Sequence, residues 1–300
     1  PYAMGYARSV TDNHLSQTIM AVAEQRVSGS PAPDMVLWPE NSTDVDPVLD
    51  FESHQIVMGA LALSNRPILV GAVTDGPGND ERQTTSMWWP PSSPQPTSTY
   101  HKRNLVPFGE WIPARSFFLP LIPVLKNIGR QSVPGTSPGV LDATIAGQQV
   151  SIGVVACFEV AYDDTVADAV RHGAKILAVQ SNNSSFIGTS QTPQQWQITR
   201  ARAVETGRHI VVSTTNSFSG LVNPDGSVAL RTNEGGHTNF TVTMPLESGL
   251  TIGVQIAPLL RIVILVCASG TIAVSLLQRR RAMLAQANHN RSERDVRHRH

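Results

Sequence analysis

Short apolar runs and segments with helical spacing alternate along most of the chain. Apolar runs bounded by polar or turn residues predict buried strands at residues 35–38, 67–73, 86–89, 150–157, 175–180 and 210–215. Apolar residues that recur every three or four positions predict helices at residues 12–26, 48–64, 165–172 and 194–206. Strands that alternate with helices favour an α/β fold in which the helices pack outside the sheet.

Two segments depart from this alternation. Residues 111–128 are apolar and aromatic, but interior prolines prevent one regular helix because they break its hydrogen-bond ladder. Further on, the sequence Asn-Pro-Asp-Gly at 223–226 predicts a turn. We expect this turn to precede a hairpin formed by residues 228–230 and 240–242.

The C-terminal part has a different character. Between Leu250 and Leu277 the only charged residue is Arg261, and three arginines follow at 279–281. A membrane-spanning helix needs roughly 20 apolar residues, so this segment is long enough to span a bilayer. Arginines at its end place the tail in the cytoplasm and the preceding domain on the outer side. The alternative is a buried core helix.

Composition and charge narrow the classes of function. Of the 300 residues, 41% are hydrophobic and 15% charged, which allows a large core. The 23 basic residues balance 23 acidic ones, and the basic residues cluster in the tail, which argues against a nucleic-acid binder. Two cysteines form no disulfide framework. The chain begins at Pro1 without a methionine, so we expect the front of a longer protein to be missing.

Cys157 is a candidate nucleophile at the end of a predicted strand, with Glu159 two residues further on. A free thiol has a pKa of about 8.5, so it needs a nearby base or positive field to attack efficiently. The alternative is that Cys157 is a small buried apolar residue of the strand.

Glu40 and Lys102 are the candidate partners of this thiol. Glu40 follows an apolar run and is suited to act as a general base, or else to cap the next helix. Lys102 lies between a predicted strand and an apolar turn that contains Pro107. An inward-facing ammonium there would stabilise a tetrahedral oxyanion, whereas an isolated lysine is otherwise a surface residue.

The order of these three residues resembles the Glu-Lys-Cys triad of the nitrilase, or carbon-nitrogen hydrolase, superfamily. Three motifs are further similar to those of apolipoprotein N-acyltransferases of the actinobacterial type: LWPENS at 37–42, KRNLVPFGE at 102–110 and RAVETGR at 202–208. The resemblance extends from about residue 12 to the apolar segment near the C-terminus.

This resemblance implies a nitrilase-like αββα sandwich followed by one C-terminal transmembrane helix. The expected parts are a catalytic domain at 1–248 whose first strand is missing, a transmembrane helix at 249–278, and a basic, disordered tail at 279–300. The resemblance also implies that Glu40 is the base, Lys102 the oxyanion stabiliser and Cys157 the nucleophile. Glu110 is then a supporting carboxylate, while Phe158 and Glu159 line the pocket. It implies no cofactor and no metal.

The family's reaction moves a fatty acyl chain from a phospholipid, through a Cys157 thioester, to the α-amine of a lipoprotein's N-terminal diacylglyceryl-cysteine. The expected partners are therefore a phospholipid donor, a diacylglyceryl-lipoprotein acceptor and the cell membrane, with the catalytic domain on the extracytoplasmic side. Residues 111–125 would then be an arm that touches lipid, or alternatively part of the core.

The chain departs from the family's pattern at two places. Asn182-Asn183-Ser184-Ser185-Phe186 stands where the family often has Asn-Asp-x-Trp-Phe, and Phe158 stands where a tyrosine is common. Both changes affect the lining of the pocket. The competing functions are a carbon-nitrogen hydrolase that acts on a small amide or nitrile, and an inactive, truncated module anchored to the membrane.

Overall fold

The computed structural model describes residues 2–297, and side chains throughout this range except those of 2–7, 127 and 284–297. The chain divides into two compact units, Pro1–Thr251 and the helix that begins at Ile252.

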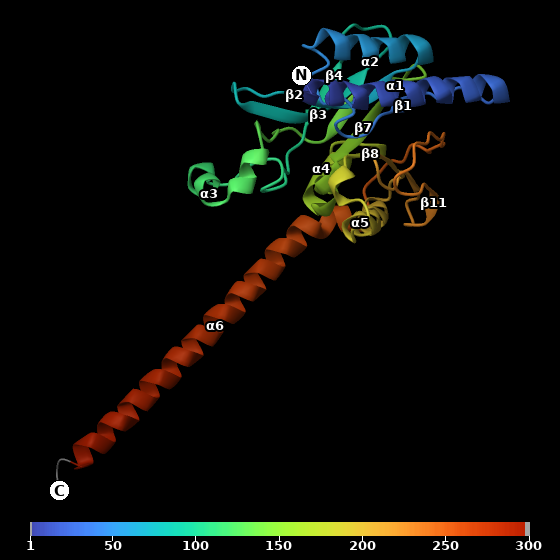
Figure 1. Ribbon diagram of the computed structural model, residues 1–300. Helices are drawn as coiled ribbons and strands as arrows, with labels where there is room; N and C mark the ends of the chain where they lie inside the picture. The colour runs from blue at the N-terminus through green and yellow to red at the C-terminus, as the bar shows by residue number, and fades with distance from the viewer. Residues whose placement is uncertain (1, 298–300) are drawn as a thin grey trace. The chain divides into compact units, whose positions relative to one another are not determined.

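Two sheets form the centre of the first unit (Figure 1). One has the order β1 (Val36–Leu37), β2 (Ile68–Asp75), β3 (Glu81–Trp89), β4 (Ser98–His101), and β5 (Gln131–Ser132) pairs with β3. The other has the order β11 (Val228–Arg231), β10 (Gly220–Val222), β9 (Ile210–Thr214), β8 (Ile176–Ser181), β7 (Gln148–Ala156), β6 (Val140–Ile145). Because β7, β8 and β9 run parallel, their carboxyl ends meet at one edge of the sheet.

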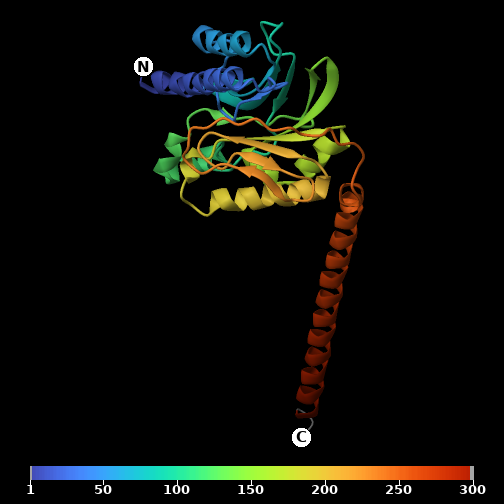
Figure 2. The same ribbon diagram turned by 90° about the vertical axis from the view of Figure 1, so that its right-hand side faces the viewer.

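Helices cover the outer faces of the two sheets, as Figure 2 shows. α1 (Tyr2–Ser28) and α2 (Phe51–Ser64) lie on the side of the first sheet, and α4 (Asp163–Arg171) and α5 (Gln191–Thr206) lie on the side of the second. Shorter helical segments are α3 (Arg115–Leu121), η1 (Pro123–Asn127), η2 (Cys157–Ala161) and η3 (Ser184–Phe186). The αββα sandwich expected from the sequence is thus confirmed.

Three apolar clusters explain why the strands appear as continuous apolar runs in the sequence. Alternate residues of one strand enter different clusters, because successive side chains point to opposite faces. In β7, for example, Val154 packs between the sheets, whereas Val155 packs against α4 and α5. In β2, Leu69 packs between the sheets, whereas Val70 packs against α2. Both faces of each sheet are covered, so both sets of side chains must be apolar.

The structure corrects two predictions about the second sheet. Residues 228–230 do not form a hairpin with residues 240–242: β11 pairs with β10, and the turn at 223–226 joins these two strands. The strand predicted at 150–157 ends at Ala156, because Cys157 adopts a left-handed backbone conformation with φ of 48°. Such a residue cannot continue a strand.

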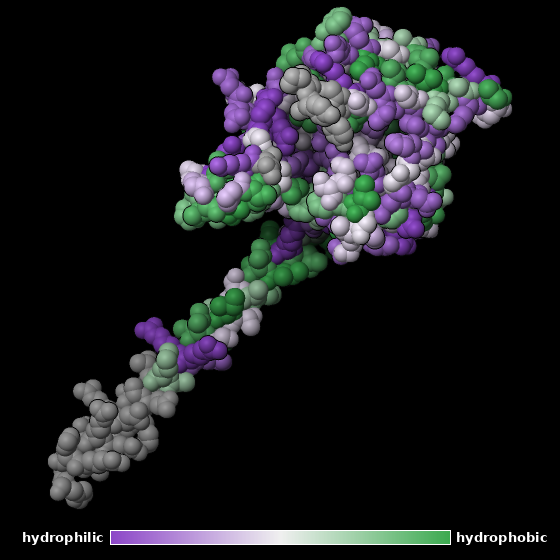
Figure 3. Space-filling model, in the orientation of Figure 1, coloured by the Kyte–Doolittle hydropathy of each residue, from purple (hydrophilic) through white to green (hydrophobic). Residues whose placement is uncertain are grey.

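The second unit is the helix α6 (Ile252–Arg297). Its part from Ile252 to Met283 is long and apolar enough to cross a membrane by length and composition, and its most apolar stretch of 18 residues has a mean hydropathy of 2.2. Figure 3 shows that most of this part is coloured as hydrophobic and that a hydrophilic band lies near its C-terminal end. The helix continues past residue 278, where the sequence analysis expects a disordered tail. Leucine, alanine, glutamine and arginine in this stretch are all strong helix formers.

Candidate active site

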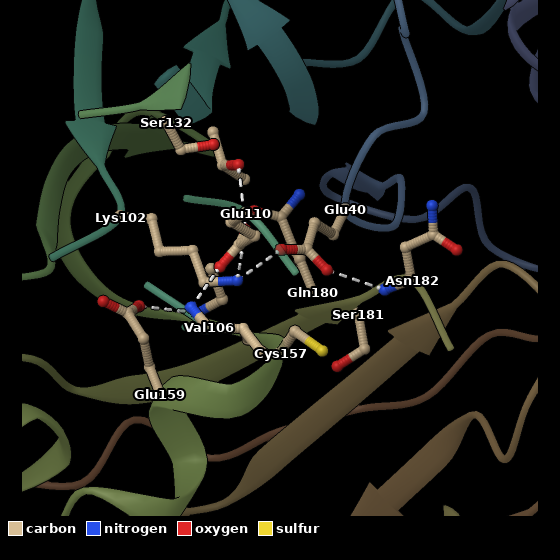
Figure 4. Close-up of polar contacts among 12 residues, drawn as sticks. Glu40, Lys102, Val106, Glu110, Ser132, Cys157, Glu159, Gln180, Ser181 and Asn182 are labelled. Atoms are coloured by element: carbon tan, nitrogen blue, oxygen red, sulfur yellow. Dashed lines mark hydrogen bonds and ion pairs between the residues drawn. The ribbon is translucent and has the colours of Figure 1, made fainter. Parts of the chain in front are cut away.

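The candidate catalytic side chains follow the ends of three strands. β1 ends at Leu37 shortly before Glu40, β4 ends at His101 immediately before Lys102, and β7 ends immediately before Cys157. Figure 4 shows that their side chains converge between the two sheets. Residues far apart in the sequence are therefore brought together by strand ends, which are rigidly positioned by the sandwich.

Lys102 lies between two carboxylates. Its Nζ donates to Glu40 Oε1 at 3.0 Å and to Glu110 Oε1 at 2.9 Å, and its side chain is only 2% exposed. Burial lowers the pKa of Lys102, but the charges of Glu40 and Glu110 outweigh this effect and hold the pKa above its usual value. The ammonium therefore stays protonated at any physiological pH.

The two carboxylates are held by backbone groups as well as by Lys102. The N–H of Asn182 donates to Glu40 Oε2 at 2.8 Å, and the N–H of Val106 donates to Glu110 Oε2 at 2.7 Å. Burial raises the pKa of Glu40, and the opposing effect of Lys102 offsets this only in part. A raised pKa suits a carboxylate that must accept a proton from a thiol.

Gly71 allows the loop that carries Glu40 to lie against β2. A Cβ atom added at Gly71 would lie 2.2 Å from the carbonyl oxygen of Pro39 and 2.8 Å from the Cα of Glu40. Such distances are far below van der Waals contact. The position of Glu40 therefore depends on the absence of a side chain at this strand residue.

Cys157 is buried beside this cluster. Its Sγ donates to Asn183 Oδ1 at 3.5 Å. Burial raises the pKa of the thiol to about 12, with a further increase from Glu40 and an opposing contribution from Lys102. With its pKa raised to this extent, the resting nucleophile is a neutral thiol at neutral pH. Deprotonation must therefore accompany its attack.

The family resemblance implies that Glu159 lines the pocket, but the structure gives this side chain other contacts. It is completely buried, and its Oε1 accepts hydrogen bonds from Tyr100 Oη at 2.7 Å and from the N–H groups of Arg103 and Asn104 at 2.7 and 3.1 Å. Its Oε2 accepts from the N–H of Ala156 at 2.9 Å. Glu159 thus connects the backbone next to Cys157 with the backbone next to Lys102.

Phe158 is half-buried beside the nucleophile. Its ring packs edge-on against Tyr162, with the ring centroids 5.3 Å apart. Within the described residues, no group of three or more histidine, cysteine, aspartate or glutamate side chains is arranged to hold a metal ion.

Several site residues were not singled out by the sequence analysis. Gln195 Nε2 donates to the carbonyl oxygen of Cys157 at 3.3 Å and to Ser181 Oγ at 2.9 Å. Asn182 and Asn183 stand out in the sequence only as departures from a family motif, and Tyr100 does not stand out. Gln195 and Tyr100 carry no local signal, because a glutamine on a helix and a tyrosine on a strand are common in any α/β protein.

A thiol beside a buried carboxylate and a buried ammonium is suited to acyl transfer. The carboxylate can take the thiol proton, and the ammonium can stabilise negative charge on the oxygen of a tetrahedral intermediate.

Comparison with known proteins agrees with this chemistry. The carbon-nitrogen hydrolase family model matches residues 52–249, which include Lys102 and Cys157 and begin after Glu40. The apolipoprotein N-acyltransferase of Mycolicibacterium smegmatis is 33% identical over 274 residues, which is 90% of this chain and 45% of the relative. That of Bdellovibrio bacteriovorus is 32% identical over 209 residues, or 66% of this chain and 38% of the relative. The chain thus spans less than half the length of these relatives.

Solved structures share the fold at low sequence identity. An amidase from Nesterenkonia sp. superposes with a TM-score of 0.54 and 18% identity, covering 75% of this chain and 81% of the amidase. The nitrilase-superfamily protein Nit3 of Saccharomyces cerevisiae superposes with a TM-score of 0.53 and 16% identity, covering 73% of this chain and 80% of Nit3. The resemblance to apolipoprotein N-acyltransferases expected from the sequence motifs is confirmed, and the chain belongs to the carbon-nitrogen hydrolase family.

Proposed function

We propose that this chain carries the catalytic domain of an apolipoprotein N-acyltransferase, in which Glu40, Lys102 and Cys157 are the catalytic residues. The observation that carries the proposal is the buried Glu40–Lys102–Glu110 ion cluster next to the Cys157 thiol. The similarity to curated N-acyltransferases supports the choice of reaction within the family.

In the first half-reaction Cys157 attacks an ester carbonyl of a phospholipid. The thiol proton passes to Glu40 while the S–C bond forms, and the negative charge that develops on the carbonyl oxygen is stabilised by the Lys102 ammonium. The N–H that follows Cys157 is a second candidate donor to this oxygen. The C–O bond then breaks, and the leaving alkoxide takes the proton from Glu40 and departs as a lysophospholipid.

In the second half-reaction the α-amine of a diacylglyceryl-cysteine attacks the thioester. The amine transfers a proton to Glu40 as the C–N bond forms, and the same oxyanion stabilisation applies. The S–C bond then breaks, and Glu40 returns the proton to the departing sulfur of Cys157. Both steps balance without water or a cofactor, and the products are an amide-linked acyl chain and the free thiol.

Exposed apolar side chains support a substrate that comes from a membrane. In the arm formed by α3 and η1, Phe117, Leu121 and Val124 are between 62% and 65% exposed, whereas Ile112 and Leu125 are buried. The protruding lobe in Figure 3, at the place where Figure 1 labels α3, is largely coloured as hydrophobic. A soluble amidase gains nothing from such a surface, because exposed apolar side chains favour association. We infer that the arm touches lipid.

The proposed location follows from the C-terminal helix. We propose that the apolar part of α6 spans the cell membrane, with the arginines at 279–281 on the cytoplasmic side and the catalytic domain at residues 1–248 on the extracytoplasmic side. Labelling of single introduced cysteines on either side of the helix with a membrane-impermeant maleimide tests this orientation.

Mass spectrometry of the full chain incubated with phospholipid vesicles tests the function. We expect a hydroxylamine-labile acyl adduct on Cys157 that is absent from the Cys157→Ala variant and unchanged in Cys267→Ser. An adduct with phospholipid but not with a small amide favours the acyltransferase. Turnover of a small amide without lipid adduct favours a hydrolase instead, and reaction with neither favours an inactive module.

A further inference from the structure

Two amide side chains contact Cys157 from the side of α5 and η3. Gln195 donates to the carbonyl oxygen of Cys157 and Asn183 accepts from its thiol, at 3.3 and 3.5 Å. Both residues line the same small cavity, whose other polar lining residues are Thr192, Thr199, Thr214 and Ser217. These two hydrogen bonds to Cys157 come from uncharged side chains and are distinct from those of the Glu40–Lys102–Glu110 cluster.

The contact with Gln195 has a consequence for the next peptide group. No peptide bond in the described structure is cis, so the C=O of Cys157 and the N–H of Phe158 point in opposite directions across one rigid plane. A hydrogen bond that holds the C=O toward Gln195 therefore directs the N–H of Phe158 away from Gln195. The left-handed φ of Cys157 is itself a strained conformation for a residue other than glycine.

We propose that Gln195 is a positioning residue that sets the Cys157–Phe158 peptide plane, so that the Phe158 N–H donates to the acyl oxygen, while Asn183 positions the thiol. This inference rests on the proposed thioester at Cys157. Ser181 contributes by holding the Gln195 amide through its hydroxyl oxygen, and Ser181 is itself completely buried at the end of β8. Gln195 thus acts on the oxyanion without touching substrate.

The two amides must then have separable effects. Alkylation of Cys157 by iodoacetamide needs a correctly placed thiol but no oxyanion donor, whereas acylation by p-nitrophenyl acetate needs both. Loss of one oxyanion-hole donor lowers catalysis by about 10²–10³-fold, and a misdirected donor is expected to cost about tenfold or more.

The experiment measures both reactions in the full chain with Cys267→Ser as the background. We expect Gln195→Met to acylate at least tenfold more slowly than the background while it is alkylated at the same rate and with the same pH profile. Gln195→Leu also removes the donor without adding a charge beside the thiol, so it should show the same selective loss. Gln194→Met, an exposed glutamine on the same helix, is the matched control and should change neither reaction.

Asn183→Leu completes the test. Without its acceptor the thiol loses its position, so both alkylation and acylation should fall together. The inference is overturned if the Gln195 variants acylate at the background rate, or if their alkylation and acylation fall by the same factor. If the ester reacts as expected but phospholipid gives no adduct, the proposed substrate fails and the positioning role stands.

Discussion

Replacement of Lys102 by methionine tests the electrostatics of the site most directly. Methionine has a similar length but no charge, so Lys102→Met leaves Glu40 and Glu110 buried without their shared cation. Two unpaired carboxylates close together cannot both stay ionised, and at least one of them must bind a proton in the folded state.

The expected loss of stability follows from proton binding. Suppose that one carboxyl is protonated in the folded variant at pH 7 but has a pKa of about 4.3 in the unfolded chain. At 1.36 kcal/mol per pH unit, the interval between this pKa and pH 7 lowers the free energy of unfolding by about 4 kcal/mol. This agrees with the roughly 3–5 kcal/mol measured when one partner of a buried ion pair is removed. The folded variant binds more protons than its unfolded state, so its stability relative to wild type falls as pH rises above about 4.5.

Chemical denaturation at several pH values measures this effect. All five tryptophans precede Ile252, so their fluorescence reports on the first unit alone. We expect Lys102→Met to approach wild-type stability near pH 4 and to be about 4 kcal/mol less stable at pH 7. The double variant Lys102→Met/Glu110→Gln should recover part of the loss. Equal stability of Lys102→Met and wild type across this range would refute the role of the ammonium in compensating the two carboxylates.

Three further predictions concern the residues that support the site. Gly71→Ala should lower the free energy of unfolding by about 1–3 kcal/mol in a denaturation assay, because its Cβ would collide with the Pro39 carbonyl oxygen. The same variant should also acylate more slowly, which an ester-burst assay measures. Tyr100→Phe removes one hydrogen bond to the buried Glu159 carboxylate, so the same denaturation assay should show a free energy of unfolding that is lower by about 1.5–3 kcal/mol. A loss below about 0.5 kcal/mol, which is typical of a neutral surface substitution, would contradict this prediction. Alkylation of Cys157 should accelerate about tenfold per pH unit from pH 7 to 10 without a plateau, because the raised thiol pKa of about 12 leaves little thiolate; a plateau below pH 8 would show a stabilised thiolate.

The sequence predicted the sandwich because apolar runs mark most of its strands, and Glu40 and Cys157 stand at the ends of two such runs. The strand before Lys102, β4, has the sequence Ser-Thr-Tyr-His, which is not an apolar run, so Lys102 is marked in the sequence mainly by the apolar turn that follows it. The convergence itself needed the resemblance to a family, since no local pattern states which strand ends meet. The family match begins only after Glu40, so the ion pair between Glu40 and Lys102 had to come from the structure.

The remaining features depend on contacts between distant segments. Glu159 was expected in the pocket because it lies next to Cys157 in the sequence, but the turn at Cys157 buries it against Tyr100 and the Arg103 backbone. The predicted hairpin between residues 228–230 and 240–242 is wrong because an apolar run near a turn can also form an extended loop. In this loop Val242 packs against the core between the sheets without pairing to a strand.

The charge balance of the site has a consequence for the order of events in acyl transfer. A thiol with a high pKa forms a poor leaving group as a thiolate, so the thioester at Cys157 is expected to persist until a proton is available to the sulfur. In the proposed second half-reaction the attacking α-amine supplies that proton through Glu40, whereas Lys102 remains protonated throughout. Departure of the sulfur is thus coupled to arrival of the amine. The second carboxylate, Glu110, strengthens this coupling, because its charge further raises the thiol pKa. In the proposed reaction, departure of the sulfur therefore waits for a nucleophile that delivers a proton to Glu40, because burial of the thiol, with a smaller contribution from the two carboxylates, disfavours a thiolate leaving group.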